Sequence, residues 1–451
     1  MDKELQRVVE RLETALDEQS ASIAKYRAYY DGKHRLSFAT SKYREEFDAM
    51  LREVTDNWIP LVVDAVSERL HVEGFRFGPD GSADLDAWDF WQRCFMDADS
   101  ELLHTETLIT GVGYAMVWGK PDAAGGVEPL ITVEDPEQVV VMLEPGSRRT
   151  RRYALKRWED DWTGSQYLNL YTPDLVLKMR KVDGGKLEEL ERLTNPLRVV
   201  PVVPFYNRPR TLPGSYRSEV FDVLSTQDQI NKILCDAIVA SEFAAYRQRW
   251  ATGVEVEIDE ETRRPINPWE SGQNRVMIAT DADSRFGTFD ATDLANYTRM
   301  LENRIQSVAS RTRTPPHYLL GQSGSFPSGE SLKATETGLI AKVRSRMRHF
   351  GESWEEVMRL AFAVADPTDQ RANYMRSETI WADPESRTEA EHVDALVKLR
   401  TLGVPIRQLW EDAGYSQEQI QRMLNFATEE SVRASMAKPS NIVIASSAPA
   451  E

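Results

Sequence analysis

The longest stretch of the sequence without glycine or proline constrains the fold most. It covers Ser218–Trp250, and its Leu, Ile and Ala residues recur at helical spacing. A second helical stretch, residues 290–313, ends before Pro315, because proline disfavours a helical conformation in the preceding residue. Between the two, residues 251–289 carry an alternating strand pattern at Val254–Ile258. The sequence therefore predicts two long helices that bracket a small β insertion.

The first 217 residues change their hydrophobic period several times, as expected for an α+β region. Helical spacing covers the N-terminal segment and Leu85–Thr110, whereas His71–Phe77 alternates like a strand. After Gly113 strand-like runs separated by turn residues take over. Repeated prolines from Pro201 to Pro213 mark the expected end of this region. The fold class predicted is α+β, mainly helical. The strand-like runs are Tyr114–Trp118, Val139–Met142, Tyr167–Tyr171 and Leu175–Leu177.

A loop rich in Gly and Ser, Gly321–Gly329, precedes the longest amphipathic pattern of the chain. The helix it opens is expected to reach Ala365, with its apolar residues inside one arc of roughly 100°. A compact helical unit is expected over residues 386–428. The sequence then becomes rich in Ser, Ala and Pro, so residues 429–451 are predicted to be a flexible tail.

The charge balance and the cysteines exclude several classes of protein. The 451 residues contain 55 Lys and Arg against 72 Asp and Glu, a formal net charge of −17. A protein that coats nucleic acid through a broad basic surface is therefore not expected. Cys94 and Cys235 are too few for a disulfide framework and are predicted to be buried thiols. The charged N-terminus predicts no signal peptide, and no apolar run approaches ~18 residues, so no membrane partner is expected.

The sequence lacks the motifs of common enzymes. No G-x-x-x-x-G-K-[ST] phosphate loop occurs, and Gly111–Gly113 lacks the third glycine of a dinucleotide fingerprint. The six histidines are scattered without metal-ligand spacing, and no strand precedes Ser323 as a nucleophile elbow requires. A solvated strand face explains the acidic cluster Glu255–Glu261 more simply than Mg²⁺ binding does. We therefore expect no catalytic residue, no metal and no cofactor.

One basic run lies on the long helix after the Gly/Ser loop. Lys342 and Arg346 fall on one edge of its apolar arc, and Arg344 and Arg348 fall on the other. Each pair places like charges one turn apart, which destabilises a helix by about 0.2–0.5 kcal/mol, so a nearby group should compensate. The compensating groups are either acidic residues within an oligomer, helped by Glu352, or nucleic-acid phosphates. Acidic neighbours are favoured, because basic edges are common on amphipathic helices.

Six segments of the chain resemble the portal proteins of tailed bacteriophages, in the version found in phages of actinobacteria. No single segment is as specific as a catalytic motif, but their order and spacing are together characteristic. The resemblance extends over residues 1–428. The segments are Tyr29–His34, Asp56–Trp58, Val200–Arg208, Asp228–Lys232, Ser310–Pro316 and Ser328–Lys333.

The resemblance implies a homo-oligomeric ring, usually a dodecamer, at one capsid vertex of the virion, assembled in the cytoplasm of the bacterial host. Double-stranded DNA passes through its central channel during packaging and ejection. The terminase large subunit docks first, the connector or adaptor and the tail follow, and the major capsid protein surrounds the ring. The implied regions are a wing (1–217), stem helix 1 (218–250), clip (251–289), stem helix 2 (290–313), tunnel loop (314–329), the spanning helix of the wing (330–385), a helical crown (386–428) and the tail (429–451).

The resemblance also suggests where the channel and the docking surfaces lie. Five loop residues are expected at the narrowest point of the channel: Gln322, Ser323, Ser325, Phe326 and Ser328. Five basic residues are expected to face the lumen or a neighbouring subunit: Lys333, Lys342, Arg344, Arg346 and Arg348. The clip residues singled out are Glu255, Glu257, Arg263, Arg264 and Trp269.

Two other classes of function stay open at this point. A nucleic-acid-processing enzyme, such as a nuclease, would need a metal-dependent activity that clustered carboxylates support. Another structural virion protein, such as a scaffold, is the second alternative. Scaffolds tend to be charged and poorly folded, whereas this chain has eleven tryptophans and a mixed α+β region.

Overall fold

The computed structural model divides into two compact units built from interleaved parts of the chain. Unit 1 contains Met1–His34, Trp58–Leu224 and Ala309–Glu451, and unit 2 contains Arg35–Asn57 and Ser225–Val308. Unit 2 is therefore inserted into unit 1 along the sequence. The structure describes residues 2–34, 55–78, 83–121, 126–245, 249–254, 258–259, 263, 283–289, 293–319, 329–385, 389–415 and 417–436.

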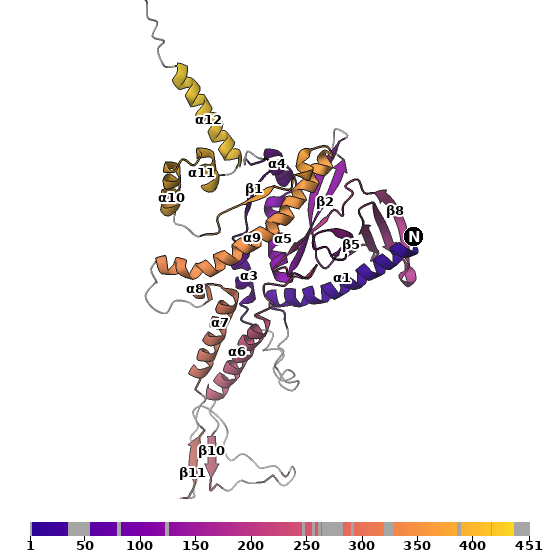
Figure 1. Cartoon of the computed structure of the whole chain (residues 1–451). Coiled ribbons are helices and arrows are strands. Elements are labelled where there is room, and N and C mark those ends of the chain that lie inside the picture. The colour runs from indigo at the N-terminus through magenta and orange to yellow at the C-terminus, as the bar shows by residue number, and fades with distance from the viewer. Residues whose placement is uncertain are drawn as a thin grey trace, which may run out of the picture. The chain divides into compact units, whose positions relative to one another are not determined.

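Unit 1 combines helices and antiparallel sheets, which confirms the α+β class (Figure 1). Its helices are α1 (Lys3–Tyr30), α3 (Ile59–Ser67), α4 (Leu85–Arg93), α5 (Met96–Thr110), α8 (Pro316–Leu319), α9 (Gly329–Ala365), α10 (Glu389–Thr401), α11 (Ile406–Asp412) and α12 (Gln417–Met436). Its strands are β1 (Val72–Arg76), β2 (Val112–Pro121), β3 (Val127–Glu134), β4 (Val139–Leu143), β5 (Arg151–Glu159), β6 (Gln166–Tyr171), β7 (Leu175–Lys181), β8 (Leu187–Thr194), β9 (Val202–Tyr206) and β12 (Glu378–Trp381).

Two antiparallel sheets form the centre of unit 1, and a small ladder adds a long-range connection. The first sheet has the order β3-β2-β9, and the second follows the chain from β4 to β8. β1 pairs with β12, so that Phe75 lies opposite Thr379 across a separation of about three hundred residues. The strand-like runs of the sequence fall within β1, β2, β4, β6 and β7, and these predictions are confirmed.

The alternation of side chains along β2 sets the layers of unit 1. Gly113 faces α5, where a Cβ would lie 2.2 Å from the Thr107 Oγ1, so only glycine permits this approach. Gly119, on the same face of β2, lies against Val364 of α9. Tyr114 points the other way and packs with residues of the five-stranded sheet. One face of the three-stranded sheet is thus covered by α5 and α9, and the other by the second sheet.

The far face of the five-stranded sheet is covered by α1. Leu12 and Leu16 of this helix are fully buried against Leu155 and Leu170 of the sheet. The spacing of the apolar residues along α1 gives the helix one buried face, as its sequence indicates. Unit 1 is therefore a stack of helices, sheet, sheet and helix.

The interior between α5 and α9 is aromatic. The Trp354 Nε1–H donates to the His104 Nε2 at 2.8 Å, and the His104 Nδ1 lies 3.1 Å from the carbonyl oxygen of Leu70. The ring of Phe350 stacks on His104, and Trp91 packs edge-on to Trp354. Complete burial lowers the pKa of His104 to about 3, so the imidazole is neutral and accepts the indole hydrogen bond.

Three sequence-based boundaries are wrong. The helix expected over Leu85–Thr110 is two helices, because Phe95 between them has a left-handed backbone with φ of 58°. The helix expected over Ser218–Trp250 is α6 (Leu224–Ala245), because tertiary contacts hold residues 218–223 outside it. Residues 429–436 belong to α12 and not to a flexible tail, since the sequence has no Gly or Pro between Gln417 and Met436. Residues 437–451 lie outside the described residues.

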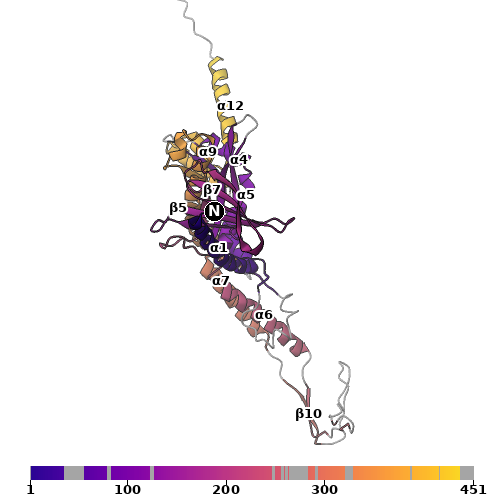
Figure 2. The same ribbon diagram turned by 90° about the vertical axis from the view of Figure 1, so that its right-hand side faces the viewer.

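Unit 2 contains a helical pair and a hairpin. α6 and α7 (Ala295–Thr312, whose last residues belong to unit 1) run side by side in both ribbon views (Figures 1 and 2). The Arg304 Nη1 donates to the Gln229 Oε1 at 3.2 Å and links the two helices. β10 (Arg249–Thr252) pairs with β11 (Arg285–Thr288) in an antiparallel ladder. The two predicted helices are therefore present in the described part of unit 2. The observed strands differ from the prediction, because Arg249 and Trp250 were expected to be helical, and most of the predicted strand Val254–Ile258 lies outside the described residues.

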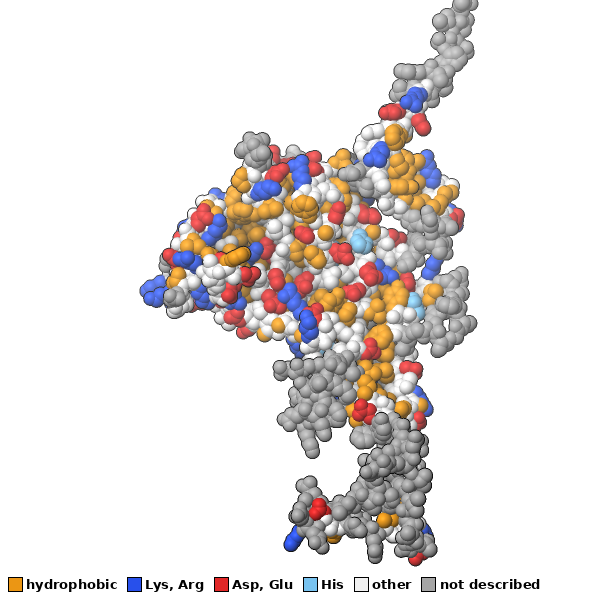
Figure 3. All heavy atoms as spheres, turned by 180° about the vertical axis from the view of Figure 1, so that it is seen from behind, with side chains coloured by type: hydrophobic (Ala, Val, Ile, Leu, Met, Phe, Trp, Pro, Cys, Tyr) orange, Lys and Arg blue, Asp and Glu red, His pale blue; other side chains and the backbone are white. Residues whose placement is uncertain are grey.

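Charges of both signs are interspersed over the surface of unit 1. The space-filling view shows Lys and Arg beside Asp and Glu across its face, with hydrophobic side chains between them (Figure 3). Many of these charges form ion pairs, such as Arg180–Glu188 and Arg157–Asp17. In the described part of the chain no helix has the length and apolar content needed to cross a membrane. Cys94 and Cys235 are buried and free, as expected.

Candidate functional site

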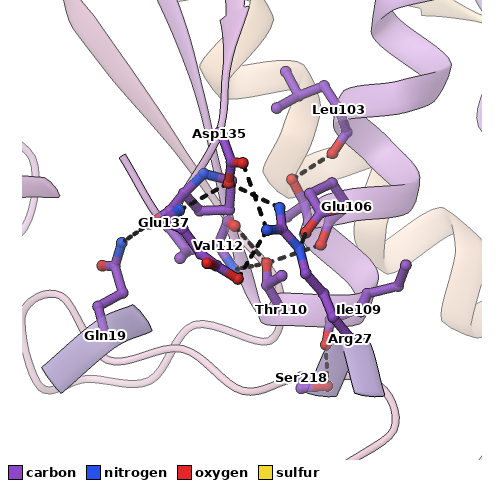
Figure 4. Close-up of polar contacts among 12 residues, drawn as sticks. Gln19, Arg27, Leu103, Glu106, Ile109, Thr110, Val112, Asp135, Glu137 and Ser218 are labelled. Atoms are coloured by element: carbon purple, nitrogen blue, oxygen red, sulfur yellow. Dashed lines mark hydrogen bonds and ion pairs between the residues drawn. The ribbon is translucent and has the colours of Figure 1, made fainter. Parts of the chain in front are cut away.

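The segment that leads into α6 is anchored to the end of α5. The Ser218 hydroxyl donates to the carbonyl oxygen of Ile109, and the backbone N–H of Glu219 donates to the Leu108 oxygen at 2.9 Å. These bonds hold Ser218 and Glu219 in a non-helical conformation (Figure 4). Glu219 is consequently turned toward the interior of unit 1, where only 5% of the residue is exposed.

Glu219 joins two basic residues of α9 in a buried ion cluster. Its Oε1 lies 2.8 Å from the Lys342 Nζ, and its Oε2 lies 2.8 Å from the Arg346 Nη2. The three side chains are 4%, 4% and 9% exposed. The Lys342 Nζ also donates to the carbonyl oxygen of Thr312, the last residue of α7, at 2.9 Å. We call Glu219, Lys342 and Arg346 the ion cluster.

The two cations keep the Glu219 carboxylate ionised. Burial alone would raise its pKa, but Lys342 and Arg346 outweigh burial and lower the pKa to about 2. The Asn207 Nδ2 donates a further hydrogen bond to the same carboxylate at 3.3 Å. Because one carboxylate meets two cations, removing it would leave two buried positive charges together.

Further polar contacts hold the segments that precede and follow residues 225–308 of unit 2. Asp222 forms ion pairs with Arg208 and Arg217, and its carbonyl oxygen accepts from Arg311 near the end of α7. The Tyr318 hydroxyl donates to the Glu336 Oε1 of α9 at 2.9 Å. Two of the segments of unit 1 that adjoin unit 2 along the chain, residues 218–224 and 309–319, are therefore tied to α9.

A second charged cluster joins α1 to the same end of α5. Arg27 contacts three carboxylates, with distances of 2.7 Å to Glu106, 2.8 Å to Asp135 and 2.8 Å to Glu137 (Figure 4). Burial by itself lowers the pKa of Arg27, but these carboxylates raise it above its usual value. The end of α5 that holds Ser218 is thus fixed from α1 as well.

The structure corrects the prediction for two of the basic residues. Lys342 and Arg346 are buried against Glu219 of the same chain and do not face a lumen or a neighbouring subunit. Their position explains how two like charges one turn apart are tolerated, since the carboxylate lies between them. Glu219 itself was missed. The only signal for it in the sequence is the need for a compensating charge near these two residues.

The other three predicted basic residues, all on α9, are exposed. Arg344 pairs with Glu385 at 2.6 Å and is half exposed. Lys333 and Arg348 are exposed. Arg263 of the predicted clip is also exposed, and its backbone N–H donates to the Asp259 oxygen at 2.9 Å. Nine further predicted residues lie outside the described residues: Gln322, Ser323, Ser325, Phe326, Ser328, Glu255, Glu257, Arg264 and Trp269.

The described residues provide no obvious centre for catalysis. No group of three or more His, Cys, Asp and Glu among them gathers in a geometry that could hold a metal ion. A cavity of about 610 Å³ lies between the β1–β12 ladder and α10–α11, where Arg76 pairs with Glu411 at 3.1 Å. A second cavity of about 580 Å³ lies between β9 and α9 and is lined by several arginines.

Comparison with known proteins shows the family to which the chain belongs. The sequence model of the family described as "phage portal protein, SPP1 Gp6-like" matches residues 9–430. The chain is 30% identical to the portal protein of Mycobacterium phage L5 over 435 residues, which is 94% of this chain and 88% of the relative. It is also 30% identical to the portal protein of Mycobacterium phage D29 over 431 residues, 92% and 87% of the two chains. The match runs across both units and nearly the whole length, and the chain belongs to the phage portal protein family.

Proposed function

We propose that twelve copies of this portal protein form a ring at the capsid vertex, through which double-stranded DNA enters during packaging and leaves during ejection. The observation that carries the proposal is the family match, which includes unit 2 as well as unit 1. The proposed partners are the terminase large subunit, the connector or adaptor and the major capsid protein. Assembly takes place in the bacterial cytoplasm.

The regions of the ring subunit follow from the resemblance. Residues 1–217 and the helix from 330 form the wing, α6 and α7 form the stem, and residues 251–289 form the clip. Residues 314–329 form the tunnel loop, and residues 386–428 form the crown. The helical pair and hairpin of unit 2 support this assignment, since a stem and a clip need such elements.

The proposed channel lets DNA slide without holding it. A net charge of −17 per subunit disfavours tight binding of a polyanion, because strong binding needs many Lys and Arg contacts to phosphate. In this proposal the tunnel loop, with Gln322, Ser323, Ser325, Phe326 and Ser328, forms the narrowest point. Lys333, Arg344 and Arg348 face the lumen or a neighbour, and the clip residues face the docking partners.

The ion cluster ties three segments of unit 1 to one another. Glu219 precedes α6, and the cluster also holds the last residue of α7 against α9. The chain is proposed to have no enzymatic activity of its own, and the work of translocation is assigned to the terminase.

The experiment is direct imaging and counting of the assembly. The purified chain is examined by negative-stain electron microscopy and native mass spectrometry, and rings with a central hole and twelve subunits are expected. Capsids that lack the protein should package no DNA with purified terminase. A chain that stays monomeric in the cell and in vitro, or a metal-dependent nuclease activity abolished by carboxylate substitution, would overturn the proposal.

A further inference from the structure

The cavity between β9 and α9 is basic although the whole chain is acidic. Its walls include five side chains that carry or can carry positive charge and one exposed methionine. Its volume of about 580 Å³ falls in the range of ~300–1,000 Å³ that is usual for binding sites. We call it the arginine pocket. It is lined by Arg148, Arg149, Arg151, His349, Arg359 and Met375, among others.

Two arginines of the pocket are not paired with a carboxylate of the described residues. Arg151 and Arg149 are paired, with Glu356 at 2.5 Å and Glu352 at 3.3 Å. In contrast, the Arg148 Nη2 donates to the carbonyl oxygen of Arg210, and the Arg359 Nη1 donates to the Ser377 hydroxyl. Four guanidinium groups thus face two carboxylates, so the pocket has an excess of positive charge.

His349 also lines the pocket, but the cations that act most on it, Arg346 and Arg348, lie outside the pocket lining. Partial burial lowers the pKa of its imidazole, and the positive charges of Arg346, Arg348 and Arg148 lower it further. Glu352 opposes this effect but does not reverse it. The excess of positive charge in the pocket therefore rests on its four arginines and two carboxylates, not on His349.

A surface that is acidic and partly apolar lies at the start of α5. Phe95, the residue before the helix, and Leu102 in its second turn are 77% and 64% exposed. Asp99 and Glu101 lie beside them, and no cation of the described residues pairs with either. We call these four residues the α5 stripe. It combines apolar area with unpaired negative charge.

Phe95 is held in this exposed position by the surrounding structure. Its left-handed backbone is unfavourable for a bulky residue. Cys94 before it is fixed to β3, since its Sγ accepts from the Ile131 N–H at 3.3 Å. An exposed aromatic ring kept in a strained conformation indicates a contact that the isolated subunit does not make.

The two surfaces lie at opposite edges of the three-stranded sheet. Its strand order is β3-β2-β9. The α5 stripe adjoins β3 through Cys94, whereas the arginine pocket is lined by Pro204 and Tyr206 of β9. A closed ring requires two different surfaces on each subunit, one for each neighbour. Complementary charge and exposed apolar side chains match these two surfaces to each other.

We propose that the α5 stripe of one subunit binds in the arginine pocket of the next subunit. The proposal rests on the ring proposed above. Asp99 and Glu101 meet Arg148 and Arg359, and Phe95 and Leu102 pack near Met375. The occupant of the pocket is thus a second copy of this chain.

Charge reversal on each side, alone and combined, tests the proposal. R148E/R359E and D99R/E101R should each weaken subunit association by at least ~10-fold, since like charges then oppose each other across the contact. The variant with all four substitutions should regain rings, because its charges are again complementary. The matched control is R7E/R11E on the exposed face of α1, which should assemble like the natural protein. Native mass spectrometry and sedimentation at several salt concentrations measure the association.

Cross-linking gives a readout that does not depend on charge. L102C/M375C places one exposed thiol on each surface, and a short bis-maleimide should then link subunits into covalent chains longer than a dimer. L102C alone should give no such ladder. The natural cysteines are buried and add little background.

The outcomes separate this proposal from the proposed function. If the natural protein forms rings and the charge-reversed variants form them equally well at all salt concentrations, the contact is wrong and the ring stands. If the natural protein forms no ring under any condition, the proposed function fails first. Restored ring formation by the fourfold variant supports the contact. If the fourfold variant does not form rings and circular dichroism shows that its monomer is unfolded, the four residues have a structural role and the proposed contact is wrong.

Discussion

The two halves of α9 are held in unit 1 by different chemistry. In the first half Lys342 and Arg346 surround the Glu219 carboxylate, and the Lys342 Nζ reaches a carbonyl of α7. In the second half Phe350 and Trp354 pack in an aromatic interior around neutral His104. Aromatic packing tolerates small shifts, whereas charges held at hydrogen-bond distance do not. The half of α9 next to the connection with unit 2 is therefore the half with the stricter geometry.

We expect the largest loss of stability from removal of the Glu219 carboxylate, which holds the first half of α9. Glu219→Gln leaves Lys342 and Arg346 buried without a counter-charge, and we expect a loss of about 3–5 kcal/mol of unfolding free energy. Urea denaturation followed by circular dichroism measures it. Glu188→Gln, which removes an exposed ion pair with Arg180, is the control and should cost about 0–1 kcal/mol. Equal losses for the two variants would contradict a special role for the ion cluster.

The second half of α9 should make the unfolding free energy depend on pH over a different range. The pKa of His104 is lowered to about 3 from 6.5, so its unfolded form binds a proton that the folded form excludes. Its contribution to stability is complete above pH 6.5 and falls by about 1.4 kcal/mol per pH unit below it. The Glu219 contribution falls only between about pH 4.5 and 2, because its pKa is lowered to about 2.

Comparison with a His104→Gln variant isolates this effect. Between pH 6.5 and 4.5 the natural protein should lose about 2–3 kcal/mol relative to the variant. The comparison is needed because burial and Glu352 raise the pKa of Glu355 to about 7, which favours the folded form as the pH falls. Parallel pH profiles for the two proteins would show that His104 is protonated in the folded state.

The smallest expected effect concerns Gly338, in the first half of α9. A Cβ at this position would meet only the Arg313 Cβ, at an ordinary 3.6 Å. Gly338→Ala should therefore raise the unfolding free energy by about 0.5–1 kcal/mol, as alanine is the better helix former. Thermal unfolding measures the change. A destabilised variant would mean that α9 is bent or crowded there in a way the backbone does not show.

The spacing of apolar residues in the sequence was sufficient to predict helices and strands that bury one face. The apolar arc of α9 is buried as predicted, including Leu339, Val343, Phe350 and Trp354. β1 lies within the alternating run His71–Phe77. In both elements the buried residues are close to one another in the sequence, and the spacing of the apolar residues alone shows which face points to the interior.

Where a distant partner decides the conformation, local pattern was not sufficient. Pro204 was read as part of a boundary, but it lies in β9, an edge strand, where a missing N–H can point away from the sheet. Ser218 and Glu219 have a helical sequence context, yet their bonds to α5 and α9 remove them from α6. The carboxylate for Lys342 comes from more than a hundred residues earlier, and no spacing rule connects them.

The pairing of β1 with β12 has a consequence for how the subunit is made. The β1–β12 ladder can form only after Thr379 has been synthesised, and the larger part of unit 2, Ser225–Val308, is synthesised between Phe75 and Thr379. At ~5–20 residues per second the ribosome takes roughly 15–60 s to make that intervening chain. A truncated or half-finished chain lacks this closure and most of α9, which carries part of the arginine pocket. If the proposed contact is correct, only a complete chain can both close the β1–β12 ladder and offer the arginine pocket to a neighbour.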